Sequence, residues 1–172
     1  NYVEICPVAL DESGVSPASL AESRANVLHF SPGHQYPTGL VMPIARRRQL
    51  MNWVGSDSNR WLIEDDYDSE FRFSGKPVPS MFSMDTLGRV IYLNTFSRTI
   101  TPALRISYMI LPPELMEEFR AKLGFYSCTV ASFEQYTLAR FISGGYFEKH
   151  INRMRKFYRA RRDRVAAALE KC

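Results

Sequence analysis

The chain alternates short, nearly continuous apolar runs with longer segments of helical periodicity, and this alternation is the feature that most constrains its fold. The apolar runs lie at residues 3–8, 27–30, 61–63, 89–95 and 106–111. Apolar residues at helical spacing lie at 43–53, 113–123, 133–142 and 146–172. Apolar strands that alternate with helices are typical of a mostly parallel sheet covered by helices on both faces. The sequence therefore predicts an α/β fold.

The length and composition exclude several classes of protein. One compact domain fits the 172 residues, and a charged fraction of 23% is ordinary for a globular chain. No apolar run approaches the ~18 residues of a membrane span, so we expect no membrane association. The three cysteines are odd in number and lack metal-type spacing, which favours buried free thiols in a reducing cytoplasm. The three histidines also lack the paired spacing of a metal site.

The positive charge is concentrated at the C-terminal end of the chain. Residues 146–172 carry nine basic and three acidic side chains, so the formal charge of +4 comes from this segment. Phe147, Ile151 and Tyr158 fall on one helical face, and the arginines occupy the other faces. We interpret the segment as a long, partly solvated helix that connects two domains. The alternative is a nucleic-acid-binding module that lays this basic helix along phosphates.

Unusually polar segments follow three of the predicted strands. They are residues 31–39, residues 64–70 and residues 94–99, with Arg105 shortly after the last. Ligands of α/β sheets bind at the carboxyl ends of strands, so we expect these segments to form one site. A strand-end carboxylate can bind a protonated ring nitrogen, while the hydroxyls and guanidinium groups of the third segment suit a phosphate. Each segment alone is also compatible with an ordinary solvated loop.

The motifs in these segments form an ordered set. They read Ser-Pro-Gly-His-Gln-Tyr-Pro-Thr-Gly (31–39), Ile-Glu-Asp-Asp-Tyr-Asp-Ser-Glu-Phe (63–71) and Asn-Thr-Phe-Ser-Arg-Thr-Ile-Thr-Pro-Ala-Leu-Arg-Ile-Ser-Tyr (94–108). In this order they resemble the MocR-type branch of the GntR transcription regulators, and the resemblance covers nearly the whole chain. It implies part of a fold-type I, aminotransferase-like large domain with a mixed, mostly parallel sheet, flanking helices and a bound pyridoxal 5'-phosphate (PLP).

The resemblance also implies roles for individual residues. Asp65 matches the acid that holds the pyridinium nitrogen of PLP, and Tyr67 matches the phenol that approaches the 3-oxygen. Tyr36 stands where ordinary aminotransferases place an asparagine beside that oxygen. The groups that match the phosphate ligands are two hydroxyls and one guanidinium, those of Thr95, Ser97 and Arg105.

Arg98 occupies the position of the family's Schiff-base lysine. A guanidinium stays protonated and is a poor nucleophile, so no covalent aldimine is expected at this position. Arg98 is instead expected to pair with the phosphate or with a preformed adduct of PLP and an amino acid. In this form the chain is therefore not expected to be an enzyme.

The resemblance further implies a domain organisation. Residues 1–145 correspond to part of the PLP-binding large domain, and residues 146–172 to a long basic interdomain helix. A winged-helix DNA-binding domain and a C-terminal small domain are expected to lie outside this chain. The expected function is the cofactor- and effector-sensing part of a cytoplasmic, homodimeric regulator that responds to an amino acid or amine and contacts DNA through the winged helix. A fragment of a class I aminotransferase is the alternative of the same fold.

Overall fold

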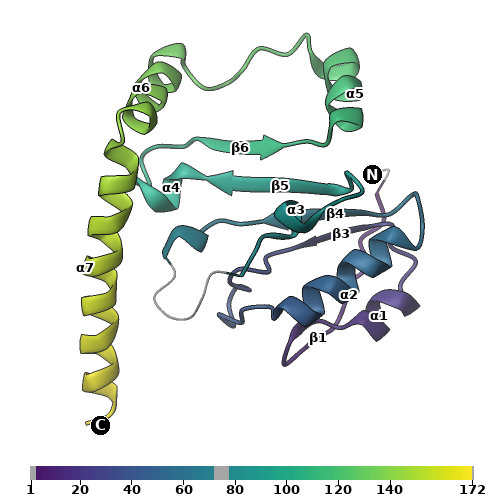
Figure 1. Cartoon of the computed structure of the whole chain (residues 1–172), viewed down its shortest axis with the longest axis horizontal. Helices are drawn as coiled ribbons and strands as arrows, with labels where there is room; N and C mark the ends of the chain where they lie inside the picture. Colours follow the sequence, from purple (N-terminus) through teal and green to yellow (C-terminus); the bar gives the residue numbers. More distant parts are fainter. Residues whose placement is uncertain (1–2, 72–77, 172) are drawn as a thin grey trace.

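The computed structural model describes residues 3–71 and 78–171, and its main sheet has four strands in the order β3-β4-β5-β6 (Figure 1). The strands are β3 (Val27–Phe30), β4 (Trp61–Asp65), β5 (Val90–Thr95) and β6 (Ser107–Ile110). β3, β4 and β5 are parallel, whereas β6 is antiparallel to β5. The predicted mixed, mostly parallel sheet is therefore confirmed. A separate small hairpin joins β1 (Leu10–Asp11) to β2 (Gly14–Val15).

Four helices begin within one residue of the predicted positions, and they are α2 (Ile44–Gly55), α5 (Pro113–Leu123), α6 (Ser132–Ser143) and α7 (Tyr146–Leu169). The described residues also form α1 (Pro17–Glu22), α3 (Met81–Met84), α4 (Phe96–Thr99) and a short 3-10 turn η1 (Ser69–Phe71). Ser16 caps α1 by accepting a hydrogen bond from the Ser19 amide, and Pro17 takes the first helical position. Within residues 3–71 and 78–171, no helix is long and apolar enough to cross a membrane.

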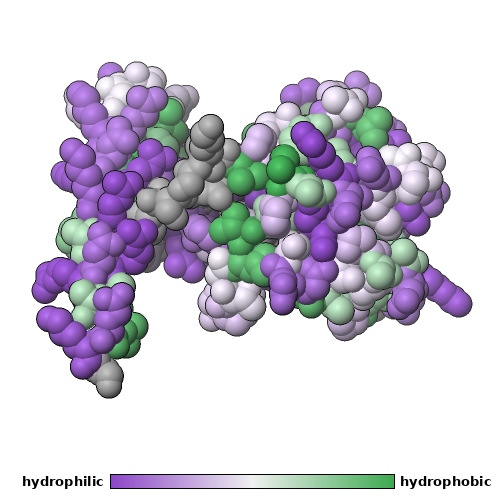
Figure 2. All heavy atoms as spheres, turned by 60° about the horizontal axis from the view of Figure 1, so that its bottom comes forward, coloured by the Kyte–Doolittle hydropathy of each residue, from purple (hydrophilic) through white to green (hydrophobic). Residues whose placement is uncertain are grey.

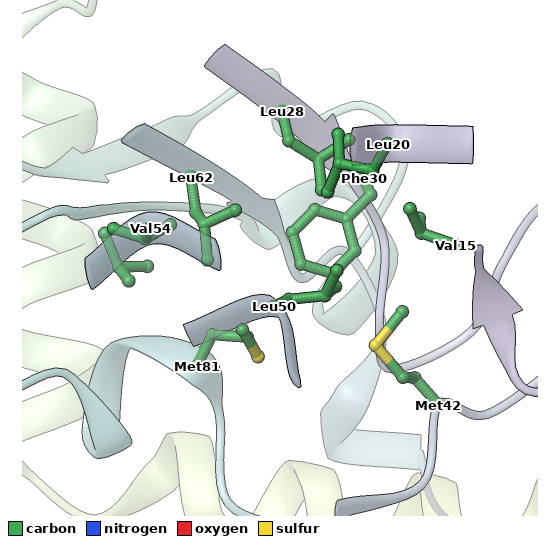
Figure 3. Packing of buried hydrophobic residues seen from close by; sticks show 10 residues of the cluster. Val15, Leu20, Leu28, Phe30, Met42, Leu50, Val54, Leu62 and Met81 are labelled. Carbon is green, nitrogen blue, oxygen red and sulfur yellow. The ribbon is translucent and has the colours of Figure 1, made fainter. Parts of the chain in front are cut away.

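The hydrophobic core lies between one face of the sheet and helices α1, α2 and α3. Figure 3 shows Leu20, Leu50 and Phe30 pointing toward one another from α1, α2 and β3. The two helices that connect the parallel strands, α2 and α3, share this face because successive right-handed crossovers in one direction place their helices on the same side of a sheet. On the opposite face Val27 and Met109 are each 45% exposed. The described residues thus cover one face of the sheet, whereas the sequence predicted cover on both.

One arginine of α2 is buried, whereas its neighbour Arg48 is exposed. Arg47 is 2% exposed and shares the buried face with Leu50 and Val54, which follow it at helical spacing. Its guanidinium donates to the backbone carbonyls of Met42, Pro32 and Pro79 at 3.2, 2.9 and 2.8 Å. The Arg47 guanidinium can be buried because three loop carbonyls, which lie outside the strands, accept its hydrogen bonds.

The buried carboxylate beside Arg47 belongs to Glu64 on β4. Glu64 Oε1 lies 3.8 Å from the Arg47 guanidinium, and the Glu64 carboxylate accepts the amides of Met81 and Phe82 at 3.0 and 2.9 Å. Burial raises the pKa of Glu64, although the two amide donors oppose the shift. This charged pair ties α2 and α3 to the strand that carries Asp65.

The N-terminal segment differs from the prediction. Residues 3–8 form no strand, and Val3 and Ile5 are exposed, because no strand in the described part of the chain pairs with them and Pro7 has no amide proton to donate. The expectation of buried free thiols is wrong for Cys128, which is exposed, and Cys6 is only partly buried. The third cysteine, Cys172, lies outside the described residues.

Helix α7 is the longest element of the chain. It runs across the end of the sheet where β5 ends, and its C-terminal half extends away from the sheet (Figure 1). Residues 156–171 are all exposed. Figure 2 shows that this protruding arm is mostly hydrophilic.

Candidate functional site

The three polar segments meet at one edge of the sheet. Each follows one of the parallel strands β3, β4 and β5, whose carboxyl ends lie side by side. A cavity of about 630 Å³ opens there. All seven residues predicted for the site line this cavity, together with Pro102: they are Tyr36, Asp65, Tyr67, Thr95, Ser97, Arg98 and Arg105. The structure therefore brings together every predicted site residue.

Asp65 stands at the end of β4 on the sheet face opposite the hydrophobic core. The alternation of side chains along β4 buries Leu62 and Glu64 toward that core and turns Asp65 away from it. The Asp65 carboxylate is 38% exposed and lies 3.7 Å from Nε2 of His29 on β3. Sequence reasoning missed His29, although the alternation of side chains along Val27–Phe30 could have placed it on the same face.

Tyr67 is held in place by the loop that follows β3. Its hydroxyl donates to the backbone carbonyl of His34 at 2.7 Å, and His34 Nδ1 lies 2.8 Å from Asp68 Oδ1. Burial raises the pKa of Tyr67, and Asp68 raises it further, while the guanidinium of Arg98 acts in the opposite direction. The phenol is therefore a hydrogen-bond donor at neutral pH. The guanidinium carbon of Arg98 lies 5.4 Å from the centre of the Tyr67 ring.

The turn that contains α4 presents the hydroxyls and guanidinium groups. Thr95 Oγ1 accepts the Ser97 amide at 3.2 Å and lies 3.2 Å from the Ile106 carbonyl, to which it donates. Ser97 Oγ donates to the Leu104 carbonyl at 2.7 Å. Both hydroxyl protons therefore point at backbone carbonyls, and each hydroxyl must rotate before it can donate to an anion.

The charge of the cavity favours an anionic ligand. Arg98 and Arg105 are exposed and line it, and Asp65 is the acidic side chain that lines it. Two permanent positive charges thus stand against one carboxylate. A planar guanidinium fork matches the oxygens of a phosphate or a carboxylate.

A buried polar network supports the site from behind. Asn94 Nδ2 donates to Glu70 Oε1 at 3.3 Å and to the Tyr92 hydroxyl at 3.0 Å, and that hydroxyl donates to Asp66 Oδ2 at 2.7 Å. Burial is the largest cause that raises the pKa of both Glu70 and Tyr92, and the charge of Asp66 adds to each shift. Glu70 Oε2 and Asp66 Oδ1 are buried and have no hydrogen-bond partner among the residues that the structure describes.

The network contains residues that the sequence analysis did not assign. Asn94 is 4% exposed and directly precedes Thr95, and its side-chain oxygen accepts the Thr95 amide. The position of Asn94 in the third motif could have drawn attention to it. Its contact with Glu70 could not be read from the sequence, because Glu70 lies 24 residues earlier in the chain, whereas Tyr92 lies on the same strand two residues before Asn94.

Comparison with known proteins identifies the family. No protein-family model matches the chain. It is 45% identical over 159 residues to the uncharacterized HTH-type transcriptional regulator YhdI of Bacillus subtilis, which covers 92% of this chain and 34% of that protein. It is 37% identical over 166 residues to the probable rhizopine catabolism regulatory protein MocR of Rhizobium meliloti, covering 96% of this chain and 33% of that protein. The chain thus spans about a third of the length of these relatives.

The fold matches that of solved aminotransferases. The crystal structure of Pyrococcus horikoshii kynurenine aminotransferase in complex with PMP superposes with a TM-score of 0.83 at 35% identity, covering 95% of this chain and 42% of that one. Both results agree with the resemblance predicted from the three motifs. The chain is therefore an aminotransferase-like α/β domain of the type found in MocR-like HTH transcription regulators.

Proposed function

We propose that this chain is the cofactor- and effector-sensing part of a PLP-dependent transcription regulator of the MocR type. The convergence of the seven predicted residues in one cavity carries the proposal. The similarity to two HTH-type regulators supports regulation rather than metabolism as the role of the whole protein. The bound PMP of the structurally similar aminotransferase supports a pyridoxal-type ligand.

The residues of the cavity fit PLP chemically. The Asp65 carboxylate, at the end of β4, suits a protonated ring nitrogen, from which it would accept a charge-assisted hydrogen bond. The excess of guanidinium charge from Arg98 and Arg105 suits a phosphate dianion. The Thr95 and Ser97 hydroxyls would turn from the carbonyls of Ile106 and Leu104 toward the phosphate oxygens. When bound, PLP supplies an aldehyde that reacts with amines and a ring that withdraws electrons.

Two tyrosines would orient the ring. Tyr67 keeps its proton at neutral pH, so it can donate a hydrogen bond to the ring 3-oxygen if it releases the His34 carbonyl. Tyr36 lines the same cavity and is 76% exposed, so it can approach the ligand from the solvent side.

Arg98 would make binding of the cofactor reversible. Its guanidinium cannot serve as the amine that attaches PLP to the protein. Its position in the cavity, next to the Tyr67 ring, suits an anionic group of the ligand, either the phosphate or the carboxylate of an amino acid joined to PLP. The chain would then sense an amino acid or amine as part of a non-covalent ligand.

The whole protein would be a cytoplasmic homodimer that contacts DNA through a winged-helix domain outside this chain. Residues 1–145 would form part of the PLP-binding large domain, and residues 146–172 the interdomain helix. The chain covers about a third of the length of each relative, which is compatible with further domains in the whole protein.

Covalent attachment of PLP tests the proposal. The protein is incubated with PLP, reduced with borohydride, dialysed and weighed by mass spectrometry. We expect saturable PLP binding but no retained mass in the unsubstituted protein, and retained mass in an Arg98→Lys variant. An Arg48→Lys variant, changed at an exposed position on α2, is the matched control. Failure of the unsubstituted protein to bind PLP contradicts the proposed function.

The alternatives make different predictions. An aminotransferase fragment requires turnover of an amino donor by the Arg98→Lys protein, because only a lysine there could attach the cofactor. A nucleic-acid module requires that charge reversal at Arg161 and Arg164, both exposed on α7, weakens DNA binding and its salt dependence. If neither effect occurs, the regulator remains the function that accounts for the site.

A further inference from the structure

Helix α7 contacts the turn that contains α4. Phe147 of α7 packs against Phe96 at the start of α4, with ring centres 5.9 Å apart. Ile151, one turn further along α7, is 5% exposed. The side of α7 that faces the sheet therefore lies directly behind the residues proposed to bind the phosphate.

The first polar contact ties α7 to the end of α4. His150 Nε2 lies 2.9 Å from the carbonyl oxygen of Thr99, which is 2% exposed. The Arg153 guanidinium lies 3.2 Å from His150 Nδ1. Because a guanidinium only donates, Nδ1 accepts and the ring proton lies on Nε2, where it is donated to Thr99. Thr99, the residue that His150 contacts, directly follows Arg98.

The second polar contact reaches the start of α4 through a chain of hydrogen bonds. Arg155 Nε donates to the backbone carbonyl of Glu70 in η1, and Tyr158 packs edge-on against Phe71 at 5.3 Å. The Glu70 carboxylate accepts Asn94 Nδ2, and Asn94 Oδ1 accepts the Thr95 amide. The path therefore runs from α7 through η1 to Thr95, the first of the proposed phosphate ligands.

We propose that His150, Arg155 and Asn94 are positioning residues. Their contacts hold the α4 turn at both ends, an arrangement that we call the clasp, and couple the position of α7 to occupancy of the site. The two contacts on α7 are five residues apart, or about 7.5 Å along a helix, and Leu169 lies about 21 Å beyond the second. A relative shift of about 1 Å between the two contacts therefore moves the far end of α7 by about 3–4 Å. The exposed arm would thus amplify a small change in the α4 turn. The coupling to PLP rests on the proposed function, whereas the clasp itself does not.

Amide hydrogen exchange without ligand tests the clasp. In α4 the Ile100 amide donates to the Phe96 carbonyl at 2.9 Å, so its exchange rate reports opening of the turn. We expect His150→Ala and Arg155→Ala to speed exchange of this amide about 2–10-fold, the effect of losing one hydrogen bond. His150→Gln, whose amide can still donate to Thr99, should restore slow exchange. Arg164→Ala, changed on the exposed part of α7, is the control.

Addition of PLP tests the coupling. We expect PLP to slow amide exchange in residues 146–158 of the unsubstituted protein and of His150→Gln, but not of His150→Ala. Coupling between two sites is reciprocal. If His150→Ala reduces the slowing of exchange that PLP causes in residues 146–158, it should therefore weaken PLP affinity by the same factor. Unchanged exchange at Ile100 in both alanine variants overturns the clasp. PLP binding without any effect on residues 146–158 overturns the coupling. Absence of PLP binding contradicts the proposed function, and the ligand-free exchange rates at Ile100 then support or overturn the clasp by themselves.

Discussion

Replacing Arg47 by methionine is expected to be among the most destabilising single substitutions in this chain. Methionine keeps an unbranched apolar stem but has no donor, so three backbone carbonyls lose the hydrogen bonds that they accept from Arg47 at 2.8–3.2 Å. The substitution also removes the positive charge 3.8 Å from the buried Glu64 carboxylate. Breaking a buried ion pair by removing one partner costs about 3–5 kcal/mol. That is a large part of the ~5–15 kcal/mol that stabilises a domain.

Urea unfolding followed by tryptophan fluorescence measures this loss, since Trp53 and Trp61 lie in α2 and β4, the elements that carry the pair. Arg47→Lys keeps the charge but cannot span three carbonyls with one nitrogen, so we expect a smaller loss of about 2 kcal/mol. Arg48→Met, at the exposed neighbouring position, should change the free energy of unfolding by less than about 0.5 kcal/mol. A midpoint for Arg47→Met equal to that of Arg48→Met would refute the reasoning.

Three further predictions concern stability. Burial raises the pKa of Glu70, so the native state binds the proton more tightly than the unfolded state, and the free energy of unfolding falls as pH rises above about 4.5. Glu70→Gln should flatten this slope in unfolding measured from about pH 4.5 to 8. An unchanged slope would contradict the raised pKa of Glu70. Leu50→Ala, at a side chain with 0% exposure, should cost about 2–5 kcal/mol in urea unfolding, against almost nothing for Gln49→Ala. Gly14→Ala should lower the melting temperature, because φ is +104° and the new Cβ would lie 2.9 Å from Met42 Cε; an unchanged value would show that the hairpin adapts.

Much of the fold could be predicted because it depends on local pattern. The apolar run at β5 and the Ser16-Pro17 cap of α1 specify their elements through period and capping, which act over a few residues. Residues 3–8 have the composition of a strand but no partner strand within residues 3–71 and 78–171, and strand pairing is a tertiary property. The burial of Arg47 could not be predicted for a related reason, since the carbonyls that accept its hydrogen bonds come from two separate segments, the loop between β3 and α2 and the segment before α3.

The sequence by itself determined the order of the elements and the polar motifs that follow β3, β4 and β5. Because neighbouring parallel strands end at one edge of the sheet, these motifs must lie next to one another, and the seven predicted residues line one cavity. The tertiary structure alone decided what stands behind that cavity. The Glu70–Asn94 hydrogen bond and the contacts of His150 and Arg155 join residues 24, 51 and 85 positions apart. Hydrogen bonds between such distant residues depend on how the elements pack, which no local pattern encodes.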